Sequence, residues 1–159
     1  MSIDPAEFRR ILGHFATGVT VLTTHHADGR PTGLTANAFC SVSLTPPLVL
    51  VCIDKNAESY TAFGESRVFC VNFLTQHQET LSRRFAKHGG EKFDGVGFRA
   101  GSAGCAILDG ALGYLECQIR QEIDAGDHTI YLGEALDAAA GDDGEPLLYY
   151  RGGYRRLGS

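Results

Sequence analysis

The sequence predicts a single domain over residues 1–159 that is mainly β, an antiparallel barrel with a few short flanking helices. Hydrophobic residues make up 43% of the chain, which is enough for one packed core. Alternating or β-branched segments recur along the chain and indicate about six or seven strands and two or three short helices. Because most of these strands follow one another without a helix between them, a barrel is favoured over a doubly wound parallel sheet.

Charge, hydropathy and cysteine usage indicate the compartment. A net charge of −5 disfavours a nucleic-acid binder, since such proteins are usually basic. No apolar run is long enough to cross a bilayer, and the N-terminal MSIDPAEF lacks the features of a secretion signal. The five cysteines are odd in number and have no CxxC spacing, which is typical of buried free thiols. We therefore expect a cytoplasmic protein that binds neither nucleic acid nor membranes.

The first third of the chain is expected to form a helix followed by strands. Asp4 is a helix cap and Pro5 suits the first turn, after which four apolar residues share one helical face, namely Phe8, Ile11, Leu12 and Phe15. A turn containing Asp28-Gly29 separates the first two strands, and Pro46-Pro47 ends the second. The strands expected here cover residues 19–24, 33–45 and 48–53, the last of them buried on both faces.

The remaining elements follow from the same signals. Short helices are expected over 56–63 and over 75–87, where Thr75 and Gln78 form a capping box and Gly89-Gly90 is a stop. The glycine-rich segment 93–104 is expected to be a loop. The further strands expected cover residues 67–74, 111–123, 128–138 and 147–157, with a hairpin turn over 124–127 and a break at 152–153.

The strand expected over 33–45 has two contrasting faces. One set of alternate residues is apolar and is expected to face the core, namely Leu34, Ala36, Ala38, Cys40, Val42 and Leu44. The other set is small and polar with one aromatic ring, namely Thr35, Asn37, Phe39, Ser41, Ser43 and Thr45. This second face is either hydrated or the floor of a site for a flat, polar ligand.

Three familiar kinds of site are not indicated. The six histidines form no HExxH motif and no cluster with finger spacing, so no metal site is predicted, and His25 and His26 are interpreted as exposed turn residues. No GxSxG elbow or Ser/His/Asp order suggests a hydrolase. The run Gly95–Gly101 is one residue too long for a dinucleotide fingerprint and does not open a helix, so no Rossmann loop is expected.

Two other groups have both a structural and a functional interpretation. His128, after the tight turn at Asp127, is either a surface group or a residue at the edge of a site. Arg83 and Arg84 stand near a helix C-terminus, where cations stabilise the negative end of the dipole, and an anion-binding role stays open. The residues alone therefore lead to an acidic β-barrel domain with one polar strand face.

Four sequence blocks occur in a fixed order along the chain. They are RRILGHFATGVTVLTT (9–24), GLTANAFCSVSLTPPLVLVCIDKNAESY (33–60), VNFLTQHQETLSRRFA (71–86) and GDHTIYLGEA (126–135). Together they resemble the short flavin reductase family, the reductase partners of two-component flavin-dependent monooxygenases. Thr45 and Ala135 depart from the residues common in that family, without affecting the expected flavin binding.

The resemblance implies an FMN-binding split barrel that is a homodimer, with FMN or FAD as the flavin and NADH or NADPH as co-substrate. The residues it implies around the flavin ring and ribityl chain are Thr35, Ala36, Asn37, Ser41, Val42 and Ser43. Those implied in the next segment are Cys52, Asp54, Lys55 and Ser59, of which Lys55 and Ser59 would lie near the phosphate. Arg83, Arg84 and Phe85 would hold phosphate or the adenylate part of FAD, and His128 would orient the nicotinamide.

The activity implied is that of an NAD(P)H:flavin oxidoreductase, which reduces FMN or FAD by hydride transfer and supplies reduced flavin to a partner monooxygenase. Two alternatives share the same scaffold. One is a flavoprotein that reduces another acceptor, such as a cobalt corrinoid. The other is a non-catalytic module that binds flavin or haem.

Overall fold

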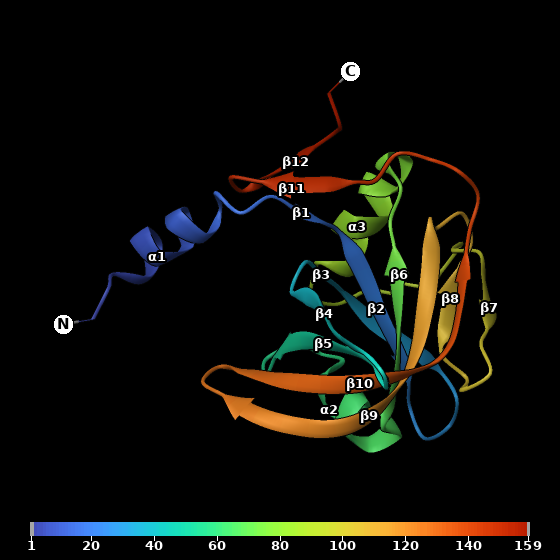
Figure 1. Cartoon of the computed structure of the whole chain (residues 1–159). Helices are drawn as coiled ribbons and strands as arrows, with labels where there is room; N and C mark the ends of the chain where they lie inside the picture. The colour runs from blue at the N-terminus through green and yellow to red at the C-terminus, as the bar shows by residue number, and fades with distance from the viewer. Residues whose placement is uncertain (1, 159) are drawn as a thin grey trace.

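The computed structural model describes residues 2–158, and one large antiparallel sheet dominates it (Figure 1). The spatial order of its seven strands is β3 (Pro31–Ala36), β2 (Thr20–His25), β6 (Val68–Phe73), β9 (Gly113–Ala125), β10 (His128–Ala140), β5 (Pro47–Asp54) and β4 (Phe39–Leu44). Every neighbouring pair in this order is antiparallel. The mainly β, antiparallel fold class is therefore confirmed.

The connection between β3 and β4 shows that this sheet is rolled up. The two strands lie at opposite ends of the spatial order, yet only Asn37 and Ala38 separate them in sequence. Three Cα–Cα steps span at most about 11 Å, whereas seven flat strands would spread over about 29 Å. The sheet must curl until its two edges meet, which makes a split barrel. We call Asn37–Ala38, with the adjoining ends of β3 and β4, the seam.

The core lies inside the barrel and continues outside it. Alternate residues of β2 face the two sides, so Leu22 packs in the barrel interior while Val21 packs in a second cluster on the outer face. The other buried residues of the interior cluster are Val49, Val51, Ile53, Phe63, Phe69, Val71, Cys117, Ile119 and Tyr131. Because both faces of β2 and β6 are covered, these two strands form the rigid centre of the molecule.

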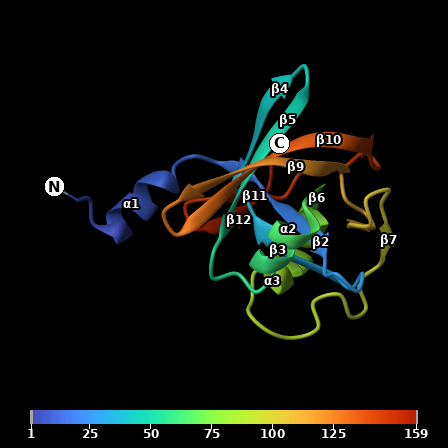
Figure 2. The same ribbon diagram turned by 90° about the horizontal axis from the view of Figure 1, so that it is seen from below.

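Short elements surround the barrel. A small sheet combines β1 (Thr17–Gly18), β11 (Leu148–Tyr150) and β12 (Gly153–Arg155), and a hairpin combines β7 (Phe98–Ala100) with β8 (Ala106–Leu108). The helices are α1 (Pro5–Leu12), α2 (Tyr60–Ser66), the 3-10 helix η1 (Gln76–Gln78) and α3 (Glu79–Phe85). Of these, α1 projects away from the body of the molecule in both views (Figures 1 and 2).

Several local predictions are confirmed at the level of single hydrogen bonds. The Asp4 carboxylate accepts from the backbone N–H groups of Ala6 and Glu7 at the start of α1. The capping box of Thr75 and Gln78 is present, although the first turn after it is the 3-10 helix η1 and α3 ends at Phe85. The expected long hairpin is β9–β10, and the break near Gly152 is the turn between β11 and β12.

The single strand expected over 33–45 is wrong, because the chain breaks at the seam into β3 and β4. The expected apolar core face is also wrong along β4. Cys40, Val42 and Leu44 are exposed, Leu44 at 94%, while Phe39 from the polar set packs against the barrel core. The turn at the seam and a register shift between Ser41 and Ser43 reverse which side chains face inward.

Other boundaries also differ from the predictions. The strand expected over 48–53 alternates, with buried Val49, Val51 and Ile53 on one face and half-buried residues on the other. The helix expected over 56–63 begins only at Tyr60, because Asp54 first holds a turn through its side chain and carbonyl. The segment expected as a loop over 93–104 contains β7, and the two-residue strand β1 was not expected.

Candidate functional site

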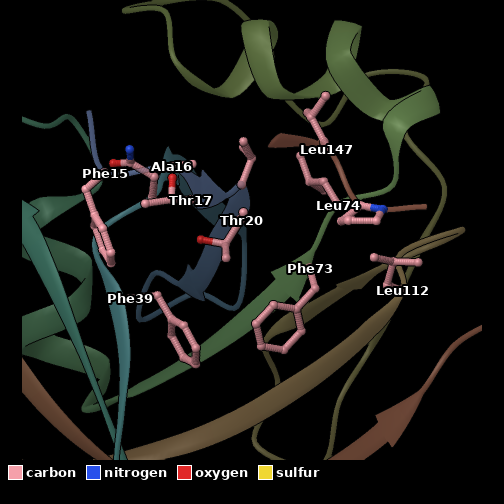
Figure 3. A pocket seen from close by; sticks show the side chains of 13 residues that line it. Phe15, Ala16, Thr17, Thr20, Phe39, Phe73, Leu74, Leu112 and Leu147 are labelled. Atoms are coloured by element: carbon pink, nitrogen blue, oxygen red, sulfur yellow. The ribbon is translucent and has the colours of Figure 1, made fainter. Parts of the chain in front are cut away.

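An open apolar pocket of about 500 Å³ lies on one side of the seam (Figure 3). Asn37 and Phe39 line it from the seam, and Phe73 meets Phe39 edge to face with the ring centroids 5.3 Å apart. The other lining residues are Phe15, Ala16, Thr17, Gly18, Val19, Thr20, Leu74, Leu112, Pro146 and Leu147. No ionisable side chain is among them, so the pocket suits a flat, apolar group with a polar edge.

A smaller pocket of about 150 Å³ lies on the other side of the seam, and most of the residues that line it are polar or charged. Thr35 of β3 and Ser59, which directly precedes α2, line it together with the buried ring of Phe85. The remaining lining residues are Leu34, Asp54, Ala57, Glu58, Ala86, Lys87, His88 and Lys92. We call this the polar pocket. Two of the chain's three lysines therefore lie at this one place.

The hydroxyl groups of the two pockets are incompletely satisfied. Ser59 is 2% exposed, and its Oγ atom has no hydrogen-bond partner among residues 2–158. The same holds for the Oγ1 atom of Thr17 at the edge of the apolar pocket. A buried hydroxyl without a partner costs about 1–3 kcal/mol. Each hydroxyl is therefore free to donate a hydrogen bond to a bound group that supplies an acceptor.

Nitrogen atoms from three residues of the segment after α3 gather around the Glu58 carboxylate. The backbone N–H of Gly89 donates to this carboxylate at 2.7 Å, while Lys92 Nζ and His88 Nδ1 lie 3.7 and 3.8 Å from it. Gly89 and Gly90 both have positive φ angles, which lets the chain fold back over the pocket at this point. The Glu58 carboxylate thus helps to hold the segment after α3 against the polar pocket.

The residues at the far end of β5 and β10 form a third group. His128 is paired in register with Asp54, and its Nδ1 atom lies 2.7 Å from the Asp127 carboxylate. A carboxylate only accepts, so Nδ1 donates, which leaves Nε2 as an acceptor in the neutral ring. The hydrogen bond from His128 also lowers the pKa of Asp127. Lys55 Nζ binds the Asp124 carboxylate and the Gly126 carbonyl rather than the polar pocket.

The residues expected around the flavin ring are divided by the seam. Thr35 donates to the Ser82 carbonyl at the polar pocket, and Asn37 lines the apolar pocket. Ala36 lies between them, and its carbonyl accepts from the Thr20 hydroxyl. Ser41, Val42 and Ser43 lie further along β4, outside both pockets, on the hairpin that extends beyond the rest of the sheet (Figure 2).

The three residues expected after the VNFL strand have different surroundings. Phe85 is buried and lines the polar pocket. Arg83 is exposed, forms an ion pair with Glu79 and stacks its guanidinium 4.8 Å from the Tyr154 ring centre. Arg84 donates to the Asp94 carbonyl at 2.6 Å. Arg83 and Arg84 therefore lie outside the polar pocket in this arrangement.

Cys52 is half-buried on β5, and burial raises the pKa of its thiol. It faces the side of β5 opposite to the barrel interior, as the alternation of that strand requires. A protonated thiol is a weak nucleophile, so the structure gives Cys52 a packing environment rather than that of a reactive cysteine.

Sequence reasoning missed part of both pockets. Phe39 was assigned to a hydrated or ligand-binding strand face, but its aromatic partner Phe73 comes from β6, which no local pattern could reveal. Lys87 and Lys92 are not among the predicted site residues, because Gly89-Gly90 between them indicates only a helix stop. The signal available was their spacing, since two of only three lysines occur within six residues.

Neither a metal-binding cluster nor a membrane-spanning helix is found in the described part of the chain. Within residues 2–158, no group of three or more His, Cys, Asp and Glu side chains is placed to hold a metal ion. The longest helix there has eight residues, and none is long and apolar enough to cross a bilayer.

The rolled sheet with its open seam places the protein in the class of split β-barrel proteins. The sequence profile described as "Flavin reductase like domain" matches residues 12–158. The chain belongs to this flavin reductase family.

Individual relatives are similar over nearly the whole chain. The reductase subunit HsaB of a flavin-dependent monooxygenase from Mycobacterium tuberculosis is 42% identical over 96% of this chain and 82% of its own length. The FMN reductase (NADH) SmoA from Agrobacterium fabrum is 42% identical over 94% of this chain and 84% of its own length. The solved structure of the NADH:FAD oxidoreductase SgcE6 from Streptomyces globisporus has a TM-score of 0.92 at 39% identity, covering 100% of this chain and 98% of the other.

Proposed function

We propose that this protein is an NADH-dependent flavin reductase that reduces FMN or FAD and supplies the reduced flavin to an oxygenase. The observation that carries the proposal is the difference between the two pockets on either side of the seam. Thr35 lines a polar pocket, and two residues further on Asn37 begins an apolar one. A ligand with a flat ring at one end and a phosphate at the other matches this arrangement.

The bound flavin supplies a ring that accepts a hydride from the reduced nicotinamide. The residues of this chain are assigned to binding and orientation. Asn37 and Ala36 present amide and backbone groups to the ring edge. Ser41, Val42 and Ser43 are assigned to the part of the ring and ribityl chain that extends out of the pockets along β4. Ser59 takes the phosphate in the polar pocket, which Phe85 also lines. Lys55, Arg83 and Arg84 are assigned to phosphate or adenylate only after leaving their present partners, the Asp124 carboxylate, Glu79 and the Asp94 carbonyl. Asp54 completes the wall of the polar pocket, and Cys52 lies on the same face of β5 outside both pockets.

His128 is assigned a positioning role rather than that of an acid or base. Hydride transfer requires no proton from the protein, so the ring serves as a polar contact for the nicotinamide. The hydrogen bond between Nδ1 and Asp127 fixes the tautomer and leaves Nε2 as the acceptor. Phe39 and Phe73 of the apolar pocket keep water away from the reacting rings.

The proposal includes two partners and a compartment. The chain acts as a homodimer, and an oxygenase component receives its reduced flavin. The oxygenase partner is supported by the HsaB relative, which is named as the reductase subunit of a flavin-dependent monooxygenase. The five cysteines are all free, which suits a reducing cytoplasm.

The test is a steady-state assay of NADH consumption with the purified protein. We expect turnover that rises with added FMN or FAD and that is faster with NADH than with NADPH. Firmly bound yellow flavin with little NADH turnover would instead support a flavin-binding module. Turnover that requires a cobalt corrinoid would support a reductase of another acceptor.

A further inference from the structure

The Lys92 side chain is largely buried at the polar pocket, yet its charge is loosely paired. The side chain is only 15% exposed, and its one ion pair within residues 2–158 joins Nζ to the Glu58 carboxylate at 3.7 Å. That separation is longer than a hydrogen bond. A buried ammonium group is costly unless it is both paired and hydrogen-bonded. The ion pair with Glu58 therefore leaves the N–H donors of Lys92 available to another acceptor.

A second donor lines the same pocket. The Ser59 hydroxyl is buried, and its Oγ atom has no hydrogen-bond partner among the described residues. The pocket volume of about 150 Å³ is below the usual range for whole ligands, about 300–1,000 Å³, and suits one terminal group. A cation and a hydroxyl that line one small pocket recognise an anion with several acceptor oxygens, which is the chemistry of a phosphate.

The Glu58 side chain already supplies an anion at this place. Its carboxylate accepts from the Gly89 N–H at 2.7 Å and lies 3.7 Å from Lys92 Nζ. The side chain is 48% exposed, so its carboxylate can turn into water without the cost of a buried charge. The other carboxylate of the pocket is different, because Asp54 accepts from the Asn56 N–H and holds the turn before α2. Glu58 is thus the exchangeable anion of the polar pocket.

The segment 87–92, which carries Lys92, is anchored at its two ends. Phe85 before it and Phe93 after it meet edge to face, with the ring centroids 5.0 Å apart. Between these rings, three residues of the segment contact Glu58, and Gly89 and Gly90 have positive φ angles. Release of Glu58 therefore lets the segment adjust around a new anion while its ends stay in place.

We propose that Glu58 competes with the flavin phosphate for Lys92, a role that rests on the proposed function. Without flavin, the carboxylate holds Lys92 and the segment 87–92 at the pocket. The phosphate then takes Lys92 together with Ser59, and Glu58 turns to solvent. Because part of the binding free energy is used to release this ion pair, the flavin binds more weakly than Lys92 and Ser59 alone would hold it. Such a competitor keeps the flavin exchangeable, as the transfer of reduced flavin to an oxygenase requires.

The first test measures flavin binding without NADH, by the change in flavin fluorescence on titration with the protein. Glu58→Gln keeps an oxygen for the Gly89 N–H but removes the charge, and we expect it to bind FMN about tenfold more tightly than the wild type. Lys92→Gln should bind FMN at least about tenfold more weakly. Neither change should alter the affinity for riboflavin, which has no phosphate.

Glu65→Gln is the matched control, because it makes the same change of charge near the other end of α2 and outside the polar pocket. Its affinity for FMN should equal that of the wild type. If Glu58→Gln binds FMN no more tightly than this control, the proposal is overturned. Equal gains for FMN and riboflavin in Glu58→Gln would also overturn it, since they would indicate a change in the shape of the site.

The double variant Glu58→Gln/Lys92→Gln distinguishes competition for Lys92 from simple repulsion between the carboxylate and the phosphate. Under competition, Glu58→Gln gives no gain in FMN affinity once Lys92 has been replaced. Repulsion would give the same gain with or without Lys92, and that result overturns the proposal.

The second test uses inorganic phosphate and no flavin, so it separates this proposal from the proposed function. Relative to sodium chloride at the same ionic strength, phosphate should raise the thermal midpoint of Glu58→Gln the most and that of Lys92→Gln the least. Equal responses of the wild type and these two variants overturn the proposal. If the expected order is found but the protein consumes no NADH with added flavin, the flavin reductase activity is refuted and the competition between Glu58 and phosphate is supported.

Discussion

At the scale of single residues, the Ser59 hydroxyl is the group whose proposed contact with a phosphate is tested most directly. Its Oγ atom is buried without a partner, so replacing it removes no hydrogen bond within residues 2–158. We expect Ser59→Ala to raise the KM for FMN about tenfold, the usual effect of losing a hydrogen bond to a charged group. The KM for riboflavin, which has no phosphate, should stay the same.

Thr17→Val is the matched control for this experiment. Thr17 has the other buried hydroxyl without a partner, but it lines the apolar pocket. A change there should alter the KM values for riboflavin and FMN by the same factor. Equal effects of Ser59→Ala on riboflavin and FMN would refute the phosphate assignment.

Glu116 shows how a single buried charge organises a loop. It is fully buried on β9 and accepts hydrogen bonds from Ser102 Oγ, Ala103 N and Cys105 N. Glu116→Gln places an amide N–H₂ group against these donors, and we expect it to lower the free energy of unfolding by about 2–4 kcal/mol. Urea denaturation measures the loss.

The control is Glu134→Gln, which removes an exposed ion pair with Arg120. Such pairs contribute less than about 1 kcal/mol. A similar loss of stability in the two variants would show that the hydrogen bonds to Glu116 stabilise the protein no more than an exposed ion pair does.

At the scale of elements, the close approach of β3 to β2 depends on a glycine. A Cβ atom at Gly33 would collide with the Leu22 carbonyl oxygen and lie 3.3 Å from the Thr23 Cα atom. Backbone atoms on the central strand cannot move aside, so Gly33→Ala should destabilise the protein by about 1–3 kcal/mol. Gly18→Ala in β1, where the space is open, should change the thermal midpoint little. Equal midpoints for the two variants would contradict this account.

Elements that local sequence signals determine could be predicted from the sequence. Elements that depend on pairing with residues far away in the sequence could not. The β9–β10 hairpin follows from alternation on both sides of a turn, and the η1–α3 start follows from Thr75 and Gln78. The break at the seam has no turn residue except Asn37, because it arises from closure of the whole sheet. Likewise β7 exists only because β8 pairs with it.

The same distinction applies to the candidate site. Thr35, Asn37 and Ser59 are among the residues that the sequence predicts, and the structure brings all three to the two pockets beside the seam. The sequence could not divide them into a ring side and a phosphate side, because that division depends on which pocket each strand end faces. Arg83 and Arg84 illustrate the limit, since they bind Glu79 and the Asp94 carbonyl.

At the scale of the whole molecule, burial sorts the five thiols into three groups. Cys40 is exposed, and burial raises the pKa of half-buried Cys52. Burial raises the pKa of Cys117 to about 12, and it also raises those of Cys70 and Cys105. At pH 8 we expect iodoacetamide to label Cys40 quickly and Cys52 slowly, because only the thiolate reacts.

The remaining three thiols should react only after urea unfolds the protein, which peptide mass spectrometry can follow over time. The expectation would be contradicted if Cys117 were alkylated in the native protein as fast as Cys40. Such a result would mean that β9 opens far more often than a strand at the centre of the sheet should.

The strand order has a consequence for how the protein is made. β5 pairs with β10, and Val51 lies opposite Tyr131 in this pairing. The two strands can therefore pair only after the ribosome has synthesised eighty further residues. Until then the nascent β4–β5 hairpin exposes a free edge and an apolar face to the crowded cell, a situation that favours misassembly. The long sequence separation between these paired strands therefore makes closure of the barrel slow and late. Newly made chains should depend on chaperones until the last third of the sequence has been translated.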